Sequence, residues 1–178
     1  MLKKIHHGVD LVKTLVPVFL CLFLLCSCNT APPPPVFDFT ALMESEDGKY
    51  SCEINCNKTD VIEVKTVTPE VLSGMTAKAG NSLVSVSFGG TVKSSDKFPE
   101  IRNFSCSKSA LILDSLRRAE LQLKAKDDSR LAYTAQTELG ELTLVTDTKG
   151  NILAFRQENS GFTLRLCHQD RENPEPEQ

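Results

Sequence analysis

Cysteine and histidine are the residues of this chain whose chemistry restricts its function most. Seven cysteines but only three histidines occur, and two of the histidines, His6 and His7, lie in the first ten residues. A Ser-His-Asp or Cys-His arrangement would therefore have to use His168, close to the C-terminus. No G-x-S-x-G elbow, phosphate-binding loop or H-E-x-x-H motif is present. The sequence predicts that the chain is not an enzyme and uses no cofactor.

Metal binding is not predicted either. The cysteines form no C-x-x-C pair, and tetrahedral zinc sites are usually built from such pairs with histidine. Carboxylates are plentiful, for example at Asp127, Asp128, Glu138 and Glu141, but nothing in their spacing distinguishes an acid–base pair from solvated turns.

The first 28 residues join a basic start to an apolar run that ends in Leu25-Cys26-Ser27-Cys28. This stretch resembles a bacterial lipoprotein signal peptide with its lipobox. The resemblance implies cleavage between Ser27 and Cys28, with a lipid then attached to Cys28. The run Leu15–Leu25 is too short for a transmembrane helix, which needs about 20 apolar residues. An ordinary secretory signal would end in an Ala-x-Ala-like site, which is absent.

The anchor predicts a location on the extracytoplasmic face of a cell membrane. Three of the 20 Lys and Arg residues and one of the 23 Asp and Glu residues precede Cys28, so the remaining chain has a formal charge of −5. Nucleic-acid binding depends on Lys and Arg that neutralise phosphates, so an acidic chain without a basic stripe excludes that class of partner.

Composition divides the chain into four parts. Residues 1–27 form the signal peptide, and residues 28–35 form the lipidated cysteine and a proline-rich tether, in which four prolines favour an extended spacer. Residues 36–168 form the folded domain. Residues 169–178 are polar, acidic and punctuated by proline, which predicts a disordered tail.

The sequence of the domain predicts short strands separated by turn residues. Apolar and polar residues alternate in Phe37–Glu44 and Tyr50–Asn57, on either side of the turn Glu46–Lys49. Further strands are predicted at 61–67, 75–79, 83–88, 91–93, 131–138, 141–146, 152–157 and 162–167. Turn residues separate most consecutive pairs, which indicates an antiparallel meander.

One helix is predicted, over residues 109–125. Ile112, Leu116, Ala119 and Leu123 recur at helical spacing, with Ser107 or Ser109 available as the N-cap. Such an apolar stripe usually packs on a sheet, so the fold class is mostly β, with a single principal helix.

This order of elements resembles the LolA-like lipoprotein group. The resemblance rests on the lipobox, on the Pro69–Met75 connection, on one long helix and on closing hairpins around Lys149-Gly150-Asn151. It implies a curved antiparallel sheet, a half-open barrel with the helix on its concave face. It also implies a concavity that can bind lipid or another hydrophobic ligand.

Two non-enzymatic functions follow. The first is binding of a lipid or other hydrophobic ligand, and the second is a structural or protein-interaction role in the envelope, for example in spore or wall assembly, without a ligand pocket. If the helix lies over an open concavity, aromatic and aliphatic side chains line a pocket; if it packs down fully, they form a core. The candidate lining residues are Phe37, Phe39, Tyr50, Ile54, Phe88, Leu116 and Tyr133.

Four cysteines remain after Cys28, namely Cys52, Cys56, Cys106 and Cys167. Cys52 and Cys56 lie in one strand about 13 Å apart, too far for a disulfide unless the strand bends. Two disulfide pairings remain possible: Cys52–Cys106 with Cys56–Cys167, or the crossed arrangement. The alternative is four free, buried thiols.

Overall fold

The structure is a computed structural model that describes residues 31–57 and 60–167. Residues from Pro33 onward form one structural unit. The predicted signal peptide, the cleavage site between Ser27 and Cys28, and the acidic tail lie outside the described residues, so these assignments remain predictions.

The described residues form one antiparallel sheet of 11 strands in the order β6-β5-β4-β3-β2-β1-β11-β10-β9-β8-β7. It does not close, because β6 and β7 each have a neighbour on one side only. The strands are β1 (Phe39–Ser45), β2 (Ser51–Cys56), β3 (Ile62–Thr68), β4 (Thr76–Gly80), β5 (Leu83–Phe88), β6 (Thr91–Ser94), β7 (Gln122–Lys126), β8 (Arg130–Thr137), β9 (Gly140–Asp147), β10 (Ile152–Gln157) and β11 (Phe162–Leu166).

Alternating apolar residues place one face of the sheet in the core, as the sequence predicts. In β2, Cys52, Ile54 and Cys56 are fully buried, while the residues between them are exposed or half-buried. The turn between β1 and β2 forms where Glu46–Lys49 predicts it, and the side chain of Asp47 accepts a hydrogen bond from the Lys49 amide.

The first and last strands join the two halves of the sheet. β1 pairs with β2 on one side and with β11 on the other, so Met43 lies opposite both Cys52 and Leu166. This long-range pairing makes a single sheet out of two runs of hairpins.

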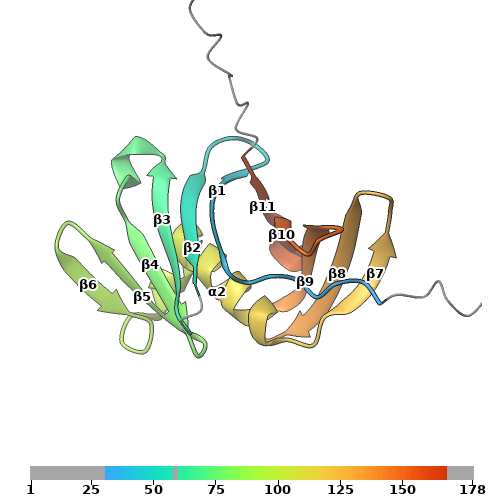
Figure 1. The fold of residues 1–178 in the computed structure, drawn as a ribbon. Helices are drawn as coiled ribbons and strands as arrows, with labels where there is room; N and C mark the ends of the chain where they lie inside the picture. Colours follow the sequence, from blue (N-terminus) through green and yellow to red (C-terminus); the bar gives the residue numbers. More distant parts are fainter. Residues whose placement is uncertain (1–30, 58–59, 168–178) are drawn as a thin grey trace, which may run out of the picture. The chain divides into compact units, whose positions relative to one another are not determined.

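The helix α2 (Ser105–Arg118) packs on the core face of both halves (Figure 1). It contacts β3, β4 and β5 on one side and β8, β9 and β10 on the other, so the sheet curves round it. Nine of its 14 residues are buried. Fully buried Ala77 and Ala79 lie in β4, where short side chains allow the helix to approach closely. The fold class predicted from the sequence is therefore confirmed.

The predicted bounds of the helix are wrong at both ends. The helix begins at Ser105, directly after the 3-10 helix η3 (Pro99–Asn103), and it ends at Arg118 because Ala119 is extended. Leu123 belongs instead to β7, where it pairs with Tyr133 of β8. The segment after Ala119 also alternates with period two, and pairing with β8 prevails over its helical spacing. Short 3-10 helices η2 (Glu70–Leu72) and η4 (Glu158–Ser160) connect other strands.

Candidate functional site

A groove of about 630 Å³ opens beside the first turn of α2. Its walls come from the β1–β2 turn, from η2 and the residue before β4, and from the start of β11. Glu46, Asp47 and Lys49 contribute charged groups to the lining. We call this feature the α2 groove; its large apolar lining residues are Tyr50, Pro69, Leu72, Met75, Phe104 and Phe162.

Tyr50 is the buried aromatic residue of the α2 groove. Its ring packs against Phe162 with 6.5 Å between centroids, and only 8% of its surface is exposed. Its hydroxyl has no hydrogen-bond partner among the described residues. Burial, reinforced by the neighbouring Cys52 thiol, raises the pKa of Tyr50 above its ordinary value. The groove is thus an apolar recess with polar groups at its edge.

The structure brings few of the seven candidate lining residues to this groove. Tyr50 lines it, whereas Ile54 of β2 and Leu116 of α2 are completely buried in the core. Phe88 is 43% exposed at the end of β5, and Tyr133 is buried in β8. Phe37 and Phe39 are partly buried against the core. Ligand lining by this whole set stays a prediction.

The four cysteines of the domain are free thiols in this structure. Cys52, Cys56 and Cys106 are buried, and the Cys106 thiol contributes to raising the pKa of Cys52. The backbone amide of Cys167 donates to the carbonyl of Leu42, which alternates with core-facing Met43. The register therefore places Cys167 on the outer face of the sheet, and Cys52 and Cys106 on the core side. Disulfide pairing stays a prediction.

We expect the free energy of unfolding to fall as the pH rises above about 9. Burial raises the pKa of Cys52 from 9.0 to about 12, and that of Tyr50 rises too, so both groups stay protonated in the folded chain while they ionise in the unfolded one. The contribution of Cys52 is complete below about pH 9 and is lost by about pH 12, whereas that of Tyr50 starts to be lost only above its ordinary pKa of 10.0. Urea unfolding at a series of pH values measures this loss. Tyr50→Phe should reduce the loss of unfolding free energy at alkaline pH without lowering stability at neutral pH. An unchanged loss in that variant would contradict the contribution of Tyr50.

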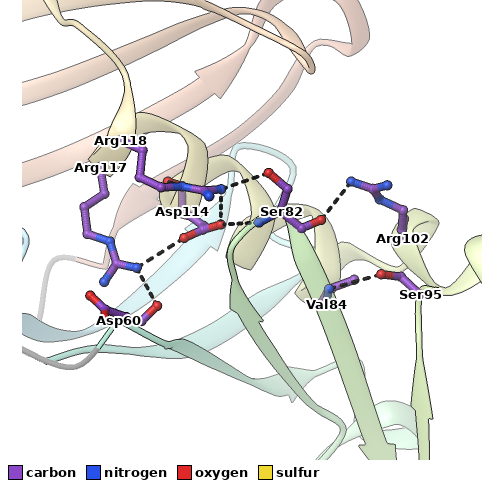
Figure 2. Close-up of polar contacts among 8 residues, drawn as sticks. All are labelled: Asp60, Ser82, Val84, Ser95, Arg102, Asp114, Arg117 and Arg118. Carbon is purple, nitrogen blue, oxygen red and sulfur yellow. Dashed lines mark hydrogen bonds and ion pairs between the residues drawn. The ribbon is translucent and has the colours of Figure 1, made fainter.

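A fully buried carboxylate, Asp114, lies on α2 beside the β4–β5 turn. It accepts hydrogen bonds from the Ser82 amide at 3.2 Å, from Arg117 at 3.2 Å, and from Arg118. Figure 2 shows these contacts converging from the helix and from the turn. Each carboxylate oxygen has at least one protein donor, so Asp114 joins α2 to the β4–β5 turn.

Three arginines extend this hydrogen-bond network to the loops that contain Asp60 and Ser82. Arg117 donates to the Asp60 carbonyl at 2.7 Å, Arg118 to the Ser82 hydroxyl at 3.1 Å, and Arg102 to the Ser82 carbonyl at 3.3 Å (Figure 2). The turn they hold is a two-residue hairpin loop in which Asn81 and Ser82 both have left-handed φ angles, 52° and 63°, a conformation that is uncommon for serine.

Sequence reasoning missed this network. The signal that could have found it is an aspartate inside an apolar stripe with arginines three and four residues later, a spacing at which side chains meet on a helix.

The proline-rich segment contacts the domain. Tyr133 donates a hydrogen bond to the Pro33 carbonyl at 2.9 Å, and the Val36 amide donates to the Gly150 carbonyl at 2.9 Å. Val36 also forms a parallel bridge with Asn151. Gly150 has a left-handed φ of 90°, and a Cβ atom there would lie 2.5 Å from the Pro34 carbonyl oxygen. Residues Pro33 to Val36, which precede the first strand, therefore contact the folded domain.

No further chemical cluster stands out in the described part of the chain. Within residues 31–57 and 60–167, no group of three or more His, Cys, Asp or Glu side chains is placed to hold a metal ion. In the same ranges, no helix is both long enough and apolar enough to span a membrane.

Comparison with solved structures gives distant likenesses, among them the following two. An uncharacterised conserved protein from Thermus thermophilus has a TM-score of 0.43 and 10% identity, covering 71% of this chain and 74% of that one. The GerS lipoprotein, in the structure of the CwlD amidase from Clostridioides difficile in complex with GerS, has a TM-score of 0.40 and 14% identity, covering 97% of this chain and 99% of that one. No family model and no curated protein matches. Neither likeness is near enough to assign a function.

Proposed function

We propose that this chain is a lipid-anchored protein on the extracytoplasmic side of the membrane that binds another envelope protein through the α2 groove, without catalysing a reaction. The Cys28 motif supports the anchor. The observation that carries the binding role is the open, aromatic-lined α2 groove itself. Protein interfaces concentrate their binding energy in such recesses, where aromatic anchors are shielded from water by a polar rim.

The packing of α2 favours a protein partner over an acyl chain. The helix occupies the concave face of the sheet, and core side chains such as Ile54 of β2 and Leu116 of α2 itself have no exposed surface. A long acyl chain would have to displace this packed core. A protein side chain needs only the groove at the end of the helix.

A hydrophobic ligand remains the second candidate, favoured by the dimensions of the groove. Its volume of about 630 Å³ lies within the usual range for small-molecule sites, roughly 300–1,000 Å³. Leu72, Met75 and Phe162 provide an apolar surface for part of such a molecule. This candidate uses the same site, so one experiment separates the two.

Photo-crosslinking from the groove tests the proposal. A photoreactive residue replaces Phe104, which is 42% exposed at the groove, or Leu83, which is 52% exposed on β5 and serves as the control. In cells that make the protein, we expect position 104 to form a discrete protein adduct and position 83 to form none. A lipid adduct at position 104, with lipid bound stoichiometrically to the purified protein, would instead support the second candidate. Equal crosslinking from both positions would contradict both.

A further inference from the structure

We infer that the β7 edge of the sheet lies against the anionic lipid surface of the membrane that holds the anchor. This inference rests on the lipid anchor of the proposed function, and it adds which part of the domain faces the bilayer. Three observations support it. The tether contacts the domain next to β7, few residues separate that contact from Cys28, and β7 exposes lysines but no acidic side chain.

The tether docks next to β7. Tyr133, whose hydroxyl binds the Pro33 carbonyl, is the β8 residue directly opposite Leu123 of β7. Paired residues of antiparallel strands lie about 5 Å apart. Pro33 and the β7 edge are therefore neighbours.

The stretch of chain between Cys28 and Pro33 is short. Only residues 29–32 separate Cys28 from Pro33, and five fully extended steps along a chain span at most about 18 Å. Once Cys28 is held at the lipid surface, Pro33 must lie within that distance of it. The other edge strand, β6, is ten positions away in the sheet, or about 48 Å at the usual strand spacing along the sheet. The lipid surface is thus within reach of β7.

The composition of β7 suits anionic lipid. All five residues of the strand are exposed, and they comprise Gln122, Leu123, Lys124, Ala125 and Lys126, with no acidic residue. Lysines extend their charge toward headgroups while their stems cover apolar surface, and Leu123 adds an apolar contact. The 3.4 Å pair of Lys124 with Glu141 leaves the lysine side chain 65% exposed.

The turn after β7 limits where the contact lies. Asp127 accepts hydrogen bonds from the amides of Ser129 and Arg130, which lower its pKa and keep it ionised at neutral pH. Together with Asp128 it would be repelled by anionic headgroups. The contact therefore belongs to the strand and not to the turn.

Energy transfer to the lipid surface tests the inference. The full chain with its native anchor, carrying a fluorescent residue at position 122 in β7 or 91 in β6, is reconstituted into phosphatidylcholine vesicles with or without phosphatidylglycerol and with an acceptor dye on the headgroups. We expect strong transfer from position 122 and weak transfer from position 91, with the difference largest when phosphatidylglycerol is present. Equal transfer from the two positions would overturn the inference.

A charge variant with a matched control completes the test. Each lysine near an anionic surface changes the ratio of membrane-contacting to non-contacting domain about fivefold. Lys124→Gln with Lys126→Gln should therefore lower that ratio about 25-fold. Lys65→Gln with Lys97→Gln removes the same charge from exposed positions far from β7 and should change nothing. Loss of transfer in both pairs, or in neither, would overturn the inference.

Flotation separates this inference from its premise. Protein that does not float with vesicles lacks the anchor, which overturns the proposed function and the inference together. Protein that floats, but transfers energy equally from positions 122 and 91, overturns the inference alone.

Discussion

Replacing Asp114 by asparagine is expected to lower the free energy of unfolding by about 2–3 kcal/mol. The carboxylate is fully buried and accepts from the Ser82 amide, Arg117 and Arg118. Asparagine keeps the volume but removes the charge and turns one acceptor oxygen into a donor that faces other donors. The loss lies at or below the lower end of the range for broken buried pairs, about 3–5 kcal/mol, because the Arg118 side chain is 39% exposed and water partly compensates it. Urea unfolding measures the change.

The control for this prediction is Asp128→Asn, which removes an exposed carboxylate from the β7–β8 turn. It should alter stability by no more than about 0.5 kcal/mol. In the Asp114 variant, the Ser82 amide should also exchange its hydrogen faster, since it loses its charged acceptor while the left-handed turn remains strained. A loss below about 1 kcal/mol would show that the network is dispensable.

The strands could be predicted because their signals are local. Alternation of Val84, Val86 and Phe88 with serines gives β5 its observed bounds, Leu83–Phe88, and the turn residues on either side locate β10 at Ile152–Gln157. Each strand is about six residues long and is followed by turn residues, so consecutive hairpins can be read from the chain without knowledge of the fold.

The pairing of β1 with β11 could not be predicted in this way. It joins Met43 to Leu166, and nothing in either segment identifies the other. The same limit explains why the sequence pattern assigns Leu123 to the helix: helical spacing is local, whereas β7 exists only because β8 lies beside it. The α2 groove likewise depends on segments far apart in sequence, and of the candidate lining residues only Tyr50 belongs to it.

The contact of the proline segment with the domain could not be predicted from the sequence either. Gly150→Ala is expected to detach this segment from the domain. An added Cβ atom would lie 2.5 Å from the Pro34 carbonyl oxygen, a backbone atom that cannot move without moving the tether. The left-handed φ of 90° adds a conformational cost of about 1–2 kcal/mol. We expect the chain before Phe37 to detach, the Val36 amide to exchange rapidly, and a protease to cut this segment first. Hydrogen exchange and limited proteolysis measure these effects.

Gly161→Ala separates detachment from backbone strain. Gly161 also has a left-handed φ, 65°, but no atom lies within 4 Å of the position of its Cβ, so that variant carries the conformational cost alone. The Val36 amide, which donates to the Gly150 carbonyl, should stay protected in Gly161→Ala and lose protection in Gly150→Ala. Equal protection in the two variants would mean that the proline segment does not depend on this contact.

Detachment would lengthen the chain between Cys28 and the first docked residue from about 18 Å to about 30 Å when fully extended. The domain could then move farther from the membrane.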